Sequence, residues 1–140
     1  MTQNAAERKT REISFTKAFS SFSVNDLEKA QNFYSQILGV DVKESPEGLE
    51  LHFDDGRLSV FIYPKKDHQP ATFTVLNFPV DNIELAVDKL TERGVRFESF
   101  DGSIETDYKG IFRGNENGQG PNIAWFKDPS GNFLSIIESD

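Results

Sequence analysis

Few residues of this 140-residue chain have the chemistry of common catalytic or metal sites. The chain has no cysteine, which excludes disulfides, thiolate metal sites and cysteine nucleophiles. Its two histidines are His52 and His68. His52 alternates with Glu50 along an expected strand, so both side chains fall on one face and could be two ligands of a metal ion. Two ligands make a weak site, and a surface or hydrogen-bonded role explains each histidine better.

Small polar residues on expected strands suggest a different chemistry. Ser21, Ser23 and Ser135 could present hydroxyl groups to a ligand, and Asn77 could present an amide. A serine nucleophile needs a neighbouring base, and the sequence pattern puts no histidine beside these serines. We therefore expect these groups to orient a ligand or to fill a wet sheet face.

Aromatic residues are plentiful, with 13 phenylalanines and a single tryptophan, Trp125. Trp125 either stacks on a ligand or packs in the core. The glycine-rich segment 101–121 is long for a loop in a compact domain, and it holds Tyr108 and Arg113 between glycines. This composition predicts a lid in which Arg113 or Lys109 pairs with an anionic group, or else a flexible or dimer-contacting loop.

Charge and hydropathy exclude several partners. The chain has 15 Lys and Arg against 23 Asp and Glu, a net charge of −8, which repels a phosphate backbone and argues against nucleic-acid binding. No apolar run approaches the roughly 20 residues of a membrane-spanning helix, and residues 1–14 form a polar tail without an apolar signal core. We expect a cytoplasmic protein with no membrane partner and a weak preference for cationic ligands.

The elements that must position these residues come in two similar units. In the first, residues 15–65, a strand ending at Val24 precedes a helix that Asn25 or Asp26 caps and Gly39 ends. Apolar residues follow helical spacing from Ala30 to Leu38. Three strands are expected next, over 40–44, 49–53 and 58–63.

A linker, 66–71, leads to the second unit, residues 72–140, which repeats this order. Asp81 or Asn82 caps its helix and Gly94 ends it. Asn82 lies 56 residues after Asp26, so the two helices start at equivalent points of an internal duplication. The expected strands are 72–80, 95–100, 122–127 and 132–138.

The stretches FSVNDLEKAQNFYSQILGV and WFKDPSGNFLSIIE resemble the signatures of the glyoxalase, bleomycin-resistance and extradiol-dioxygenase proteins, the vicinal-oxygen-chelate superfamily. The resemblance runs from about residue 15 to 138. It implies an α+β fold of two tandem β-α-β-β-β modules, whose curved mixed sheets form a cup with the helices on the convex side. It also implies a homodimer, in which modules are sometimes exchanged between chains.

The resemblance further implies where a metal ion would be held in the cup. Matching the local motifs puts those positions at Phe19, Val60, Val75 and Ser135, none of which is a good ligand. We therefore expect no metal and no cofactor. The expected ligand pocket comprises Phe19, Ser21, Val60, Val75, Asn77, Tyr108, Arg113, Trp125 and Ser135.

These observations favour metal-free binding of a small organic molecule in the cup between the modules, as in bleomycin-resistance proteins. One alternative is a metal-dependent lyase, isomerase or dioxygenase with an atypical site around Glu50 and His52. A second alternative is an accessory or regulatory binding domain.

Overall fold

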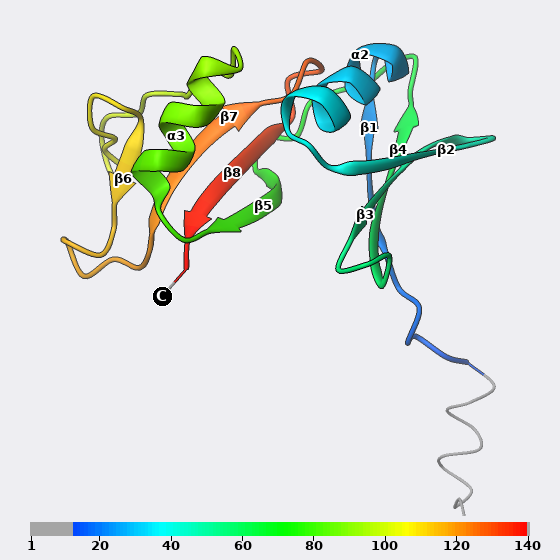
Figure 1. The fold of residues 1–140 in the computed structure, drawn as a ribbon, viewed down its shortest axis with the longest axis horizontal. Helices are drawn as coiled ribbons and strands as arrows, with labels where there is room; N and C mark the ends of the chain where they lie inside the picture. Colours follow the sequence, from blue (N-terminus) through cyan, green and yellow to red (C-terminus); the bar gives the residue numbers. More distant parts are fainter. Residues whose placement is uncertain (1–12, 140) are drawn as a thin grey trace, which may run out of the picture.

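The computed structural model describes residues 13–139, which form two four-stranded mixed sheets with their helices (Figure 1). In the first sheet the strand order is β1-β4-β3-β2, with β1 parallel to β4 and the other pairs antiparallel. The elements of this module are β1 (Ser20–Val24), α2 (Leu27–Asn32), η1 (Phe33–Ile37), β2 (Asp41–Ser45), β3 (Gly48–Phe53) and β4 (Leu58–Pro64).

The second sheet repeats this topology in the order β5-β8-β7-β6, with β5 parallel to β8 and the other pairs antiparallel. Its elements are β5 (Thr74–Val80), α3 (Ile83–Glu92), β6 (Ile111–Arg113), β7 (Asn122–Lys127) and β8 (Phe133–Glu138). The expected pair of β-α-β-β-β modules is thus confirmed.

Both helices begin at a side-chain cap. The Lys29 backbone N–H donates to Asp26 Oδ1 over 3.0 Å, and the Leu85 N–H donates to Asn82 Oδ1 over 3.1 Å. Each bond satisfies an amide of the first turn that has no partner within the helix. Of the two candidates in each unit, the structure selects Asp26 and Asn82.

The first helix changes type half-way along, whereas the sequence predicted one α-helix as far as Leu38. It continues as the π-helical turn η1, in which the Leu38 N–H donates to the Phe33 carbonyl five residues back. The wider turn accommodates two adjacent aromatic residues, Phe33 and Tyr34, both buried in the core. Side-chain packing therefore overrides the regular helical spacing.

The second strand of module two lies elsewhere than expected. Residues 95–100 form only an isolated bridge between Phe97 and Phe126. The strand is instead β6, inside the segment expected to be a loop, where it pairs with β7. Asp107 Oδ1 accepts hydrogen bonds from the backbone of Lys109 and Ile111, each over 2.9 Å, and the chain turns between them at Gly110, where φ is +86°. The hydrogen bonds to Asp107 fix the turn from which β6 begins, and hydropathy alone did not indicate this strand.

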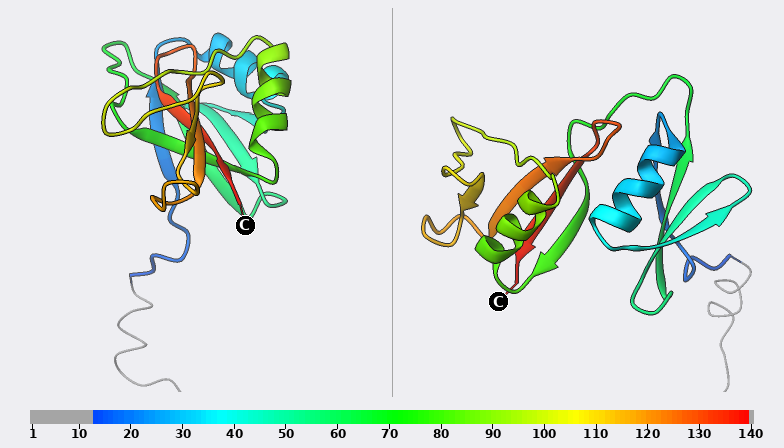
Figure 2. Two further views of the ribbon diagram at one scale, coloured as in Figure 1. Left: turned by 90° about the vertical axis from the view of Figure 1, so that its left-hand side faces the viewer. Right: turned by 45° about the horizontal axis from the view of Figure 1, so that its top comes forward.

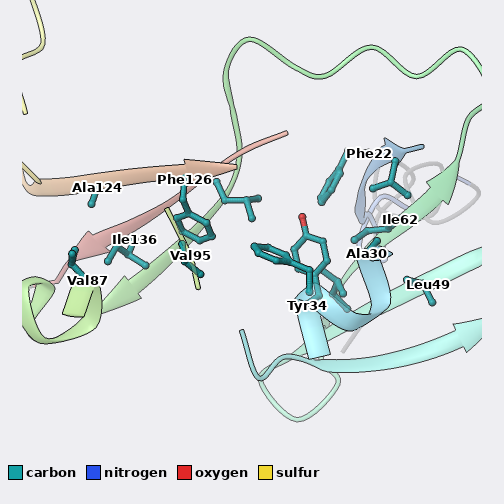
Figure 3. Packing of buried hydrophobic residues seen from close by; sticks show 14 of the residues in the cluster. Phe22, Ala30, Tyr34, Leu49, Ile62, Val87, Val95, Ala124, Phe126 and Ile136 are labelled. Carbon is teal, nitrogen blue, oxygen red and sulfur yellow. The ribbon is translucent and has the colours of Figure 1, made fainter. Parts of the chain in front are cut away.

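One hydrophobic core joins the modules (Figure 3). Buried residues of both sheets face inward onto the helices, and the Phe33 ring of η1 lies 6.4 Å from that of Phe126 in β7. Phe53 and Phe78 meet across the modules at 6.2 Å. Because the helix-bearing faces share this core, the helix-free faces point away from it (Figure 2). We call them outer face A, on the first sheet, and outer face B, on the second.

A buried carboxylate also ties the modules together. Asp128, 4% exposed, accepts a hydrogen bond of 2.8 Å from the Tyr34 hydroxyl of the first module. It also accepts from the backbone N–H groups of Ser130 and Asn132 and from the Asn132 side chain. Burial, and then the charge of Asp128, raise the pKa of Tyr34 far above its ordinary value, which keeps the hydroxyl protonated as a donor.

No helix of the described residues has the length and apolar character needed to cross a membrane.

Candidate functional site

An aromatic pocket of about 480 Å³ opens on outer face B. Four aromatic rings surround it, and small polar residues complete its wall. Its lining consists of Phe73, Phe100, Trp125, Phe133, Ile104, Thr72, Thr74, Asp101 and Ser103. The volume lies within the range of small-molecule sites, roughly 300–1,000 Å³.

Strand alternation turns the two rings at the base of this pocket outward. Trp125 lies between buried Ala124 and Phe126 on β7, and Phe133 precedes buried Leu134 on β8. Because successive side chains point to opposite faces, Trp125 and Phe133 fall on the helix-free side. The indole N–H of Trp125 donates to Thr74 Oγ1 over 3.1 Å, which fixes the ring against β5.

The loop after α3 supplies the opposite wall. Phe100 meets Trp125 edge-on, with ring centroids 5.6 Å apart and planes at 89°. Thr106 holds this part of the loop in place, since its hydroxyl accepts from the Phe100 N–H over 2.8 Å. The aromatic wall is therefore preorganised by contacts within the chain.

Charge near the pocket is sparse and mixed. Asp101 is the one ionisable residue in the lining. Just outside, the Lys127 ammonium lies 5.1 Å from the centre of the Phe133 ring and 3.6 Å from Glu98. Lys127 is thereby engaged with a ring and a carboxylate. The arrangement suits stacking of a planar ring system, with the hydroxyls and Asp101 as polar anchors.

The residues expected to form one pocket lie in several places. Trp125 lines the aromatic pocket, whereas Phe19, Val60 and Asn77 line a second cavity between the modules. Ser135 is fully buried and donates a hydrogen bond of 2.5 Å to Asn77. Ser21 pairs with Phe61 on outer face A, and Val75 lies at an irregularity of β5 and packs against the core.

Tyr108 and Arg113 lie beside α3 rather than over the aromatic pocket. Arg113 donates to Glu84 of α3 over 2.6 Å and to Asp107 over 3.1 Å. The hydrogen bond to Glu84 is the main cause of a raised pKa for Arg113. Tyr108 is 92% exposed. This part of segment 101–121 is anchored to the helix and does not form the expected lid.

Sequence reasoning missed Phe73, Phe100, Ile104 and Phe133 as pocket residues. Alternation could have indicated Phe133, because it shares a face with Ser135, which pairs with Trp125 across the strands. No local pattern could have indicated Phe100, since its place depends on how the loop folds back.

A serine–histidine pair that the sequence pattern did not suggest is present at the module junction. Ser23 Oγ lies 2.7 Å from His68 Nδ1, and His68 Nε2 lies 3.0 Å from the Ser130 carbonyl oxygen. The expectation that no histidine neighbours these serines was therefore wrong for Ser23. The Asn132 side chain also donates to the Ser23 carbonyl over 2.9 Å. These bonds join the linker, β1 and the turn before β8.

The donor set for a metal ion is poor. Glu50 Oε1 and His52 Nε2 lie 2.9 Å apart on outer face A. Within residues 13–139, no three or more His, Asp or Glu side chains gather closely enough to hold a metal ion. The positions that the family resemblance implied, Phe19, Val60, Val75 and Ser135, include no imidazole or carboxylate. The residues present therefore do not fit such an ion.

Residues 18–136 match the family model of the Glyoxalase/Bleomycin resistance protein/Dioxygenase superfamily. The chain belongs to this superfamily. No curated protein sequence matches it. Solved structures share its fold at low identity. An integron cassette protein from the Halifax Harbour sewage outfall metagenome has a TM-score of 0.62 at 21% identity, with 88% of this chain and 99% of that chain covered.

Two further solved structures are similar in fold. TnmS3, an antibiotic binding protein from Streptomyces sp. CB03234, has a TM-score of 0.60 at 23% identity over 91% of this chain and 99% of that chain. The glyoxalase family protein from Enterococcus faecalis has a TM-score of 0.60 at 21% identity over 89% of this chain and its whole own length. At these identities the likeness shows the fold alone.

Proposed function

We propose that this superfamily member binds a small aromatic organic molecule in the pocket around Trp125, without a metal ion. The observation that carries the proposal is the set of four aromatic side chains around a cavity of about 480 Å³. Phe100 lies edge-on to Trp125 and tilted to Phe133, so ring faces and edges border the cavity and offer stacking contacts to a planar ligand. The antibiotic-binding activity named for TnmS3 is consistent with this use of the fold.

A homodimer is part of the proposal. Outer faces A and B point away from the shared core, so a cup that both faces enclose requires a second copy of the chain. Phe73 at the rim of the aromatic pocket is 68% exposed, which favours further cover by a partner. Sedimentation at several protein concentrations tests this part. A monomer at every concentration would contradict it.

The chain reports binding at this pocket without a label, because Trp125 is its only tryptophan. Purified protein is titrated with three planar probes that differ in charge: neutral anthracenemethanol, anthracene carboxylate and protonated acridine orange. We expect at least one to quench Trp125 fluorescence saturably and to raise the melting temperature by mass action. If none of the three probes both quenches Trp125 fluorescence and raises the melting temperature, the proposal is contradicted.

A further inference from the structure

A second cavity lies between the two modules, apart from the aromatic pocket. It encloses about 530 Å³. The first module contributes Phe19, Phe53, Leu58 and Val60, and the second contributes Leu76, Asn77 and Phe78. Ala18, Ser20, Ser59 and Pro79 complete the lining. It shares no residue with the aromatic pocket, so the two cavities can be tested separately.

The lining of this inter-module cavity is uncharged. It contains no Asp, Glu, Lys, Arg or His, although Asp, Glu, Lys and Arg make up 27% of the chain, whose net charge is −8. An ion entering the cavity would lose water without gaining an opposite charge. The wall chemistry therefore selects a neutral occupant.

Large apolar side chains stand open to solvent at the rim. Phe19 is 66% exposed and Leu58 is 62% exposed. The Phe53–Phe78 ring contact closes the cavity where the modules meet. An apolar occupant of drug-like size would remove these side chains from water and contact both modules at once.

Among the polar side chains of the cavity, Ser20, Ser59 and Asn77, the Asn77 amide offers hydrogen-bond donors in a fixed orientation. The Ser135 hydroxyl donates to Asn77 Oδ1, and none of the residues in the described range accepts a hydrogen bond from Asn77 Nδ2. The amide N–H groups are donors. They can serve an acceptor oxygen on a ligand that is otherwise apolar.

We propose that the inter-module cavity binds a neutral, mainly apolar small molecule that carries a hydrogen-bond acceptor, such as a ketone or ester. The apolar part of the molecule lies against Phe53, Leu58 and Phe78, and its oxygen accepts from Asn77. This site is separate from the aromatic pocket and does not depend on the function proposed for that pocket.

The test uses two neutral fluorescent probes, Prodan, which is a naphthyl ketone, and N-phenylnaphthylamine, which has no carbonyl. Both are titrated into the intact protein and into Leu58→Glu, which places a charge at the rim. The matched control is Leu85→Glu, because Leu85 on α3 is similarly exposed, at 52%, and lies outside the cavity. We expect Leu58→Glu to weaken both probes by about tenfold or more and Leu85→Glu to leave them unchanged.

A second variant tests the hydrogen bond. Asn77→Ala is expected to weaken Prodan several-fold and to blue-shift its bound emission, because the carbonyl loses its donor, while N-phenylnaphthylamine binding stays the same. Equal weakening of both probes would overturn the role of Asn77. Thermal melts of each variant show whether the fold persists.

Three results would overturn the site itself. Leu58→Glu could bind both probes as well as the intact chain does. Trp125→Phe could abolish probe binding, which would place the probes in the aromatic pocket. Probe binding could fall as the protein concentration rises while the sedimentation coefficient increases, which would show that a second copy covers the cavity.

Discussion

Outer faces A and B share one strand topology but present different surfaces. On outer face A the rings of Phe61 and Tyr63 stack on each other, 6.2 Å apart with planes at 18°. The Phe61 ring also closes over Gly48, where an added Cβ would lie 3.2 Å from the ring and 2.1 Å from the Ile62 carbonyl oxygen. On outer face B the Phe100 ring lies edge-on to Trp125 and tilted by 41° to Phe133, and these rings border the aromatic pocket.

The comparison shows how a duplicated unit acquires one binding surface. In both modules the inward residues of each strand build the common core. The outward residues are released from that constraint, because alternation places them on the other side of the sheet. Aromatic residues on face A cover one another, whereas those on face B leave room for a ligand.

The largest effect is expected from a variant that removes the Asp128 hydrogen bonds between the two modules, because both faces depend on that junction. Asp128→Ala leaves the Tyr34 hydroxyl, the Asn132 side chain and backbone donors buried without their acceptor. We expect the free energy of unfolding to fall by about 3 kcal/mol or more, because each unsatisfied buried donor costs about 1–3 kcal/mol. Urea unfolding followed by Trp125 fluorescence and by circular dichroism measures it. Asp101→Ala, at an exposed loop position, is the control, and similar losses in both variants would contradict the role of Asp128.

The next prediction compares the contributions of the two faces to ligand affinity. Phe100→Ala should weaken a planar ligand found by Trp125 quenching by about tenfold, or about 1.4 kcal/mol, because it removes one wall of the aromatic pocket. Phe61→Ala removes a ring of the same size from face A and should leave that affinity unchanged. Equal affinity losses in the two variants would contradict the assignment of ligand binding to face B alone.

A smaller effect concerns Asp107, in the part of segment 101–121 that lies beside α3. Burial alone would raise the pKa of Asp107, but hydrogen bonds from the Ile111 and Lys109 backbone and from Arg113 outweigh it and hold the pKa below its ordinary value. Such a group stabilises the fold above the unfolded aspartate pKa of about 3.9, and the stabilisation is lost as the pH falls through the folded pKa.

Asp107→Asn should therefore show a flatter decline of melting temperature in the acid range than the intact chain. Melts at pH steps from about 6 down to about 2.5 measure the difference, spanning the ordinary aspartate pKa. Asp101→Asn provides the comparison at an exposed aspartate of the same loop. Parallel curves for the intact chain and Asp107→Asn would refute the assigned contribution.

The smallest effect is expected on face A, from metal ions. Glu50 and His52 offer two ligands, so Zn²⁺, Ni²⁺, Co²⁺, Mn²⁺ or Fe²⁺ should shift the melting temperature of untagged protein little or not at all. A clear shift that disappears in His52→Ala would instead support the metal-dependent alternative. It would also make face A, rather than face B, the reactive surface.

The sequence by itself determined the duplicated modules, the helix starts and most of the strands. The β7 range, for example, was predicted at the residues where the structure has it. These features rest on caps, glycine stops and alternation, which act between residues close in the chain.

Only the tertiary structure decided where Phe100, Arg113 and the short β6 strand lie. Phe100 reaches Trp125 because Thr106 holds the loop, and Arg113 turns to α3 because Asp107 and Glu84 bind it there. The π-turn η1 likewise follows from burying Phe33 and Tyr34 together in a core that both modules share. These positions depend on side-chain hydrogen bonds within the loop and on contacts with other elements, and no local periodicity encodes either.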